Sequence, residues 1–295
     1  MSTAPEAHIY EQGYRRYDGV RLGPGSSIRS LAVHSALRGL GLRRTFWAKL
    51  LPIATVIIAY LPAAVFVGFA AIVPDEARVE IGAVSANADY AGYFGIISAA
   101  ILLFVAVVGP EVLCTDRRSG MLGMYLASPL TRETYLLAKV LAVLPILLLV
   151  TLGPPLLLLI GRTLLDAGPD SVGDFLLVLA RAIVAGVVVS AIYTAVSLAA
   201  ASLTDRRAVA SAAVILLVLM SSAVTGALVE GGGADERLYL LNLGFLPYEL
   251  VQRLYGQTGD EPSIETITLL VAMMFWVLGA AAVVVGRYRK LTIAR

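Results

Sequence analysis

Cysteine, histidine and charge are scarce in this sequence of 295 residues. Cys114 is the single cysteine, so no disulfide can form within the chain, and His8 and His34 have no acidic cluster nearby to complete a metal site. Charged residues make up 15% of the chain and hydrophobic residues 58%, with a mean hydropathy of +0.82. This balance excludes an ordinary soluble domain, and the net charge of +2 argues against nucleic acid as a partner.

Long apolar runs take the place of the missing polar residues. Each has the roughly 20 residues that cross about 30 Å of hydrocarbon at 1.5 Å per residue. The runs are continuous and do not alternate, so the sequence predicts an all-α integral membrane protein with six transmembrane helices and not a barrel. The predicted spans are 51–73, 92–114, 136–160, 175–203, 207–229 and 266–286. Prolines within or at the ends of these runs are expected to kink them: Pro52, Pro62, Pro110, Pro145, Pro154 and Pro155.

The positions of the basic residues predict the orientation. The N-terminal leader, the second loop, the fourth turn and the C-terminal tail hold most of the Lys and Arg, whereas the first, third and fifth loops are mainly acidic. Because basic loops stay in the cytoplasm, both termini are expected there. We therefore expect a multi-pass protein of the cytoplasmic (inner) membrane. The basic residues of the opposite loops are Arg78, Arg162, Arg237 and Arg253.

The leader divides into two parts. Residues 1–26 include a stretch rich in Tyr, Arg and Gly that is too polar to form a core, so a cytoplasmic arm is expected there. Residues 27–50 predict an interfacial helix that begins at Ser26 or Ser27, with Gly39 and Gly41 dividing it into two short pieces. Its role is either a membrane-surface anchor or a docking surface for a cytoplasmic partner. The expected apolar stripe and anchor are Ile28, Leu31, Leu42, Phe46, Leu50 and Trp47.

The second cytoplasmic loop carries the most informative pattern. Asp116-Arg117-Arg118 and Gly120 are followed by an apolar-faced segment that stops at Ser128-Pro129, before the next span restarts near Arg132. This pattern predicts a short helix that lies parallel to the membrane between two spans and faces the cytoplasm. The alternative is a basic connector that only enforces the topology. The apolar face would comprise Met121, Leu122, Tyr125 and Leu126.

This loop resembles that of the membrane (permease) subunits of type 2 ATP-binding cassette exporters. The resemblance lies in a charged cluster, then Gly-x-Leu, then Leu-x-x-x-Pro and Arg, then a span with an early Lys. The six spans and the long external connection also resemble that family, over residues 27–290. Gly123 stands where the commoner family pattern has an acid. The matching residues are Asp116, Arg117, Arg118, Gly120, Leu122, Leu126, Pro129, Arg132 and Lys139.

The resemblance implies a dimer of six-span subunits above two ATP-binding subunits, with residues 115–134 as the ATPase-coupling loop of a transmembrane domain at 51–290. The tail is 291–295. No G-x-x-x-x-G-K-[ST] motif occurs in the chain. No cofactor is therefore expected in this chain, and ATP and Mg are expected in a partner ATP-binding subunit. The chain is not expected to be an enzyme by itself.

Three ionisable residues lie within or near the apolar runs, where charge is costly. Glu111 and Lys139 lie at similar depth on consecutive antiparallel spans, so either they pair or each extends separately to the interface. Arg181 lies about 9 Å into the fourth span from the external side at the helical rise. It is expected either to reach the external headgroups or to act within the bundle or the substrate path.

The resemblance also implies that spans two and five line a central cavity. These side chains could equally pack or bond within their own helices. The external segment 230–265 is too apolar for a water-exposed loop and predicts short helices in the outer leaflet, which either cap an export route or form a structural lid. The substrate-pathway candidates are Phe94, Ser98, Phe104, Met220, Ser221 and Thr225.

These features favour the permease subunit of an ATP-driven exporter whose substrate is hydrophobic or amphipathic. An ion-coupled carrier or channel would need buried acids or charge rings in several spans. An intramembrane enzyme would need converging nucleophiles or metal ligands, and the sequence offers no such convergence. A non-transporting membrane scaffold stays open as a further alternative. The expected partners are an ATP-binding subunit, a second permease chain, identical or homologous, and the lipid bilayer.

Overall fold

The structure is a computed structural model and describes residues 19, 23–42, 46–72, 90–127 and 130–290. All regular elements in these ranges are helices, and six helical segments there are long and apolar enough to cross a membrane. The prediction of six spans is confirmed. They are Lys49–Ile72, Tyr90–Arg118, Arg132–Leu164, Val172–Leu203, Arg207–Gly231 and Thr266–Lys290.

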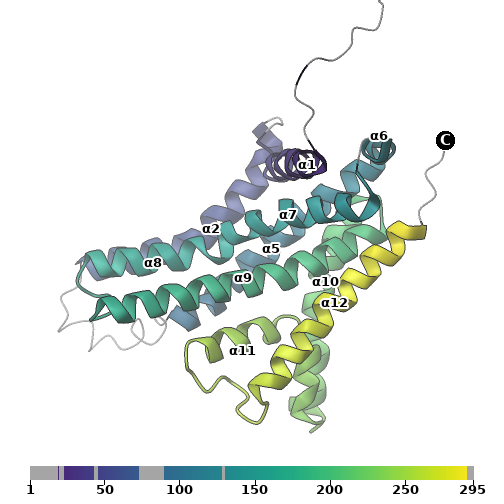
Figure 1. The fold of residues 1–295 in the computed structure, drawn as a ribbon. Helices are drawn as coiled ribbons and strands as arrows, with labels where there is room; N and C mark the ends of the chain where they lie inside the picture. Colours follow the sequence, from purple (N-terminus) through teal and green to yellow (C-terminus); the bar gives the residue numbers. More distant parts are fainter. Residues whose placement is uncertain (1–18, 20–22, 43–45, 73–89, 128–129, 291–295) are drawn as a thin grey trace, which may run out of the picture.

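The spans lie side by side and alternate in direction along the chain. α1, α6 and the end of α12 lie together at one end of the bundle (Figure 1). We call this the basic end, because the described arginines of α1, the second loop and the fourth turn lie there. In chain order the elements are α1 (Pro24–Gly39), α2 (Phe46–Ile72), α5 (Tyr90–Arg118), α6 (Met121–Ala127), α7 (Arg132–Thr151), α8 (Gly153–Leu164), α9 (Val172–Leu203), α10 (Arg207–Gly226), α11 (Phe245–Leu254) and α12 (Thr266–Lys290).

The third span is broken. α7 ends at Thr151 and α8 begins at Gly153, with Pro154 and Pro155 in its first turn. Proline tolerates that position because its missing N–H has no helical partner there. The other predicted proline sites lie inside helices that continue through them, in α2, α5 and α7. The double proline therefore ends a helix, whereas the single prolines do not.

The leader helix begins earlier than the sequence predicts and ends at the first of the two expected glycines. α1 ends at Gly39, a turn follows, and residues 46–50 form the first turns of α2. The expected break at the glycines is confirmed, but the helix begins after Gly23 and not at Ser26 or Ser27. The side chain of Trp47, most of the arm at 1–26 and the tail at 291–295 lie outside the described residues.

The buried face of α1 also differs from the expected stripe. Leu31, Ala32, Ser35 and Gly39 are buried, at the spacing of one helical face. This face packs on α7 and α5, and a Cβ on Gly39 would lie 3.2 Å from Val112. α1 is thus bound to protein along this side. Of the remaining expected stripe residues, Leu42, Phe46 and Leu50 are exposed and Ile28 is half-buried.

α5 and α9 form the centre of the bundle. α5 packs against α2, α7, α9 and α10, and α9 packs against α5, α7, α10 and α12. Small residues allow the close contact between them, since a Cβ on Gly109 would lie 2.5 Å from Ser197. Most of α5 is buried from Phe104 to Asp116. The charged residues near the end of α5, Glu111 and Asp116, are thus buried inside the protein.

Residues 230–265, which we call the external segment after the prediction, contain short helices as expected, and the segment folds back onto the bundle. α11 packs against α5, α9 and α12 (Figure 1). Asn242 fixes the start of α11, because its Oδ1 accepts hydrogen bonds from the backbone N–H groups of Gly244 and Phe245 at 2.9 and 3.0 Å. Trp276 donates to the Leu240 carbonyl at 3.2 Å. The first two bonds are local to the segment, and the Trp276 bond attaches it to α12.

Candidate functional site

A buried carboxylate at the basic end joins three helices. Asp116 of α5 is fully buried. Its Oδ1 lies 2.5 Å from Nη2 of Arg38 in α1, and its Oδ2 lies 2.5 Å from Nζ of Lys139 in α7. The Tyr135 hydroxyl donates to Oδ2 at 3.0 Å. One acid therefore holds two cations and a phenol, which compensates the cost of burying it.

Lys139 is the second fully buried charge of this cluster. Its ammonium donates to Ser35 Oγ at 2.7 Å and lies 5.1 Å from the centre of the Tyr135 ring and 5.7 Å from that of Tyr125. Tyr125 belongs to α6, so the short helix borders the same cluster. We call Ser35, Arg38, Asp116, Tyr135 and Lys139 the charge network.

The predicted pair of Glu111 and Lys139 is wrong. Glu111 pairs with Arg207 of α10 at 2.7 Å, and Lys139 pairs with Asp116. Glu111 and Asp116 are five residues apart, so their side chains leave α5 in different directions. The acid nearer to the end of the helix therefore meets α1 and α7, and the deeper one meets α10.

Two arginines of the predicted coupling loop bind the ends of other spans. Arg117 donates to the Ser202 carbonyl at the end of α9 at 2.6 Å and pairs with Asp205 at 2.6 Å. Arg132 donates to the carbonyls of Tyr288 and Arg289 in α12 at 3.2 and 2.7 Å. Helix C-termini leave carbonyls unpaired, and cations stabilise them. Both arginines, and the buried Asp116, are thus committed to contacts within this chain.

The exposed part of the loop is smaller than the sequence predicts. Arg118 and Gly120 are exposed, and Met124 is 67% exposed at the middle of α6. Leu122 and Leu126 are half-buried. Pro129 lies outside the described residues. The surface that a partner could touch therefore centres on Arg118 and Met124.

Gly120 has a conformational reason for its place in the motif. Its φ is 69°, in the left-handed region that glycine adopts without strain, and it follows directly on the last turn of α5. This turn changes the chain direction between α5 and α6. The orientation of α6 depends on it.

The charge network also shifts the titration of groups outside the spans. Burial alone would lower the pKa of Arg38, but the attraction of Asp116 outweighs it and the pKa lies above its ordinary value. Burial, together with Asp116, raises the pKa of the Tyr125 phenol. Arg38 is therefore charged at every physiological pH, and α1 stays ionically bound to α5.

The sequence analysis missed Ser35, Arg38, Tyr135 and Arg207 as members of these contacts. Ser35 and Arg38 are three residues apart and so share a face of α1, and Tyr135 lies one helical turn before Lys139. This spacing could have indicated which of these residues share a helix face. It does not indicate which other helix that face contacts.

The structure does not gather the substrate-pathway candidates. Phe94 and Phe104 are buried, and the Thr225 hydroxyl bonds the Ser221 carbonyl of its own helix at 2.8 Å. The Ser221 hydroxyl accepts a hydrogen bond from the Leu243 N–H at 3.1 Å and so holds the external segment. Ser98 is exposed and Met220 is 55% exposed on the outer surface of this chain. These last two are available to line an interface.

Arg181 contacts the end of α11. Its Nη1 donates to the Tyr255 carbonyl at the C-cap of α11 at 3.2 Å. Of the alternatives for this residue, the bond favours a role in the bundle over a position among the headgroups. The fourth span thereby fixes the end of the external helix.

Comparison with protein families matches residues 78–286 to the family described as ABC-2 family transporter protein. This match covers most of the chain and all but the first of the six spans. The chain belongs to the ABC-2 transporter family. No curated protein matches it in a sequence search.

The predicted resemblance to type 2 ABC permeases is thereby confirmed. This ABC-2 protein is a multi-pass permease subunit of an ABC transporter, in a family whose ATPase normally resides in a partner subunit. The match includes α6 and the acid of the charge network but not α1. The leader helix thus lies outside the matched residues and is bound to them through Arg38 and Ser35.

Proposed function

We propose that this chain is the permease subunit of an ATP-driven exporter, and that α6 transmits the motion of a separate ATP-binding subunit to the spans. This is supported by a difference between the residues of the loop, some of which are exposed while others are bonded to neighbouring spans. Arg118 and Met124 are exposed, while Arg117 and Arg132 on either side are bonded to the ends of α9 and α12. A push on α6 would therefore reach α5, α7, α9 and α12 together.

The proposal places the basic end in the cytoplasm, where ATP and Mg would be held by the partner. The concentration of arginine at this end supports that orientation. The substrate class proposed is hydrophobic or amphipathic, since the described spans offer little polar surface. The membrane would be the cytoplasmic one.

The test is co-purification of an ATP-hydrolysing subunit with the tagged full-length chain, from cells that carry its own partner. Arg118→Glu together with Met124→Glu should abolish the association, because both side chains face outward and neither supports the fold. Arg237→Glu, exposed at the opposite end, is the matched control and should keep the partner.

Two results would count against the proposal. If the double variant retains the ATPase in full, α6 is not the coupling surface. If the unchanged, well-folded chain brings down no ATPase, an ion-coupled carrier or a scaffold becomes the better description.

A second permease chain is also part of the proposal. Ser98, Leu103 and Met220 form exposed positions on α5 and α10, and α5 is otherwise the most enclosed span. Ser98→Cys in a Cys114→Ala chain should form a disulfide-linked dimer in membranes if the second copy is identical. Ile58→Cys on the exposed face of α2 is the control and should stay monomeric. A monomer for both, in membranes that carry out transport, would indicate a heterodimer or no dimer at this face.

A further inference from the structure

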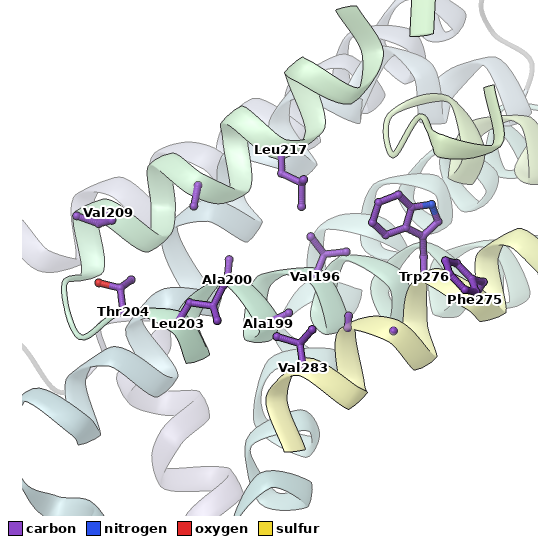
Figure 2. Close-up of a pocket in the computed structure, with 13 residues that line it drawn as sticks. Val196, Ala199, Ala200, Leu203, Thr204, Val209, Leu217, Phe275, Trp276 and Val283 are labelled. Atoms are coloured by element: carbon purple, nitrogen blue, oxygen red, sulfur yellow. The ribbon is translucent and has the colours of Figure 1, made fainter. Parts of the chain in front are cut away.

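A groove runs along the bundle between α10 and α12. Both helices pack against α9 but make almost no contact with each other. The space between them has a volume of about 680 Å³, within the range of about 300–1,000 Å³ that is typical of small-molecule sites. Figure 2 shows α9 side chains at its floor, Leu217 and Val209 along α10, and Trp276 and Phe275 on α12.

The lining is almost wholly apolar and contains small residues. Ala199, Ala200, Ala213 and Gly279 leave the space open, and a Cβ on Gly279 would meet nothing within 4 Å. Apart from Trp276, whose indole carries an N–H, Thr204 is the only polar residue of the lining. Such a lining fits a flexible hydrocarbon chain better than a polar solute.

Exposed cations follow closely in the chain on the lining residues at the basic end of the groove. Arg206 comes two residues after Thr204, and Arg287 lies one turn beyond Val283 on the same face of α12. Both are exposed, and Lys290 follows at the end of the helix. The charge at this end is complementary to a phosphate, while the adjoining wall is complementary to hydrocarbon.

The length of the groove matches one leaflet. From Arg287 to Trp276 is 11 residues, or about 16 Å at the helical rise, and half of the hydrocarbon thickness is about 15 Å. A molecule with its phosphate at Arg206 and Arg287 would thus reach the level of Trp276 with the end of its acyl chain.

We propose that this groove binds one acyl chain of an anionic phospholipid from the leaflet at the basic end, with the lipid phosphate between Arg206 and Arg287. The site is separate from α6 and from the charge network. The lipid is a component of the surrounding bilayer and not the transported substrate. The proposal does not depend on the exporter function, because it concerns the isolated permease chain.

The groove contains its own probe, since Trp276 lies at its inner end and Trp47 is the only other tryptophan. The full chain with Trp47→Phe is placed in phosphatidylcholine vesicles without ATP or any ATPase subunit. Phosphatidylglycerol or phosphatidylcholine with bromine near the end of one acyl chain is then added, and quenching of Trp276 fluorescence is followed against mole fraction.

We expect brominated phosphatidylglycerol to reach half-maximal quenching at about a tenfold lower mole fraction than brominated phosphatidylcholine, from the attraction of two arginines for an anionic headgroup. Arg206→Gln with Arg287→Gln should remove this preference. Arg29→Gln with Arg118→Gln, two exposed cations of the same end outside the groove, should keep it.

Filling the groove provides the second variant. Gly279→Leu should weaken quenching by the brominated anionic lipid at least several-fold, and Gly68→Leu, at a position on α2 with equally open space, should leave it unchanged. Equal quenching by the two lipids in the unchanged chain would indicate ordinary boundary lipid and overturn the proposal. Quenching by neither would mean that another protein segment or a second copy covers the groove, which would also overturn it.

Discussion

The two ends of the bundle each bury a carboxylate completely, but they hold it in different ways. At the basic end, Asp116 binds Arg38 and Lys139 from two other helices. At the opposite end, Glu249 of α11 binds Arg253 one turn later at 2.9 Å and accepts the Asp260 N–H at 2.9 Å. The first acid joins distant parts of the chain, and the second closes a local loop. The basic end is therefore where a local change reaches several helices.

Removing the charge of Asp116 should lower the stability of the chain more than any of the other changes. Asp116→Asn leaves Lys139 buried without a counter-ion, which typically costs about 3–5 kcal/mol. We expect a large fall in the thermal unfolding midpoint of the purified chain and release of α1, read as new protease cleavage near Arg38. Adding Lys139→Met should recover part of the loss, because no unpaired ammonium then remains. If the double variant is no more stable than the single one, the ion pair is not the source of the loss.

The matched change at the opposite end should cost less. Glu249→Gln can still accept the Asp260 N–H but loses the ion pair with Arg253, whose side chain is partly exposed and can turn to water. The expected loss is about 1–2 kcal/mol, that of one hydrogen bond to a charged group. Protease sensitivity should rise near Gly259 and not in α1. If Glu249→Gln lowers stability as much as Asp116→Asn does, the two buried carboxylates do not differ in the way described.

A pair of glycines sharpens the comparison further. Gly120 follows α5 and Gly256 follows α11, both in the left-handed region with φ of 69° and 83°. Alanine at either should lower stability by about 1–2 kcal/mol, the steric cost of that conformation. Only Gly120→Ala should also weaken co-purification of the ATP-binding subunit, because it reorients α6. If both variants weaken co-purification of the ATP-binding subunit equally, Gly120 has no specific role in coupling.

The smallest effect concerns acidity at the end opposite the basic end. Burial, followed by repulsion from Glu236, Glu249 and Asp260, raises the pKa of Glu261 above 4.5. A carboxyl with a raised folded-state pKa destabilises the fold at neutral pH, and this penalty is relieved as the pH falls through that pKa toward 4.5. Glu261→Gln should therefore be slightly more stable than the unchanged chain at pH 7, with the difference shrinking toward pH 4.5. Thermal midpoints across this range measure it, and a difference that grows with acidity would contradict the assignment.

The spans could be predicted from the sequence because lipid leaves a continuous apolar segment one choice, a helix with all its backbone groups bonded internally. Their ends extend beyond the predicted limits, as at Arg118 and Lys290, because the helices continue past the apolar runs on which the prediction was based. The break at the third span is marked by Pro154 and Pro155. The split of the leader is marked by Gly39 and Gly41.

The pairing of charges could not be predicted in the same way. Depth in the membrane correctly placed Glu111 and Lys139 near one end, but depth does not say which helix faces which. Rotation about the helix axis decides that, and the side-chain spacing of α5 turns Asp116 and not Glu111 toward Lys139. For the same reason the sequence does not show that Arg117 and Arg132, which it places in the coupling loop, bind carbonyls at the ends of neighbouring spans.

The interruption after Thr151 gives the third span a compliant point. Since Pro154 and Pro155 have no N–H groups, the carbonyls of Val150 and Thr151 have no donor four residues ahead, so the backbone hydrogen-bond ladder lacks two bonds at this junction. α7 is fixed beside α1 through Lys139, whereas α8 lies along α2. The half of this span at the basic end is therefore held beside α1 and the other half beside α2, with fewer backbone hydrogen bonds between the two halves to resist a bend.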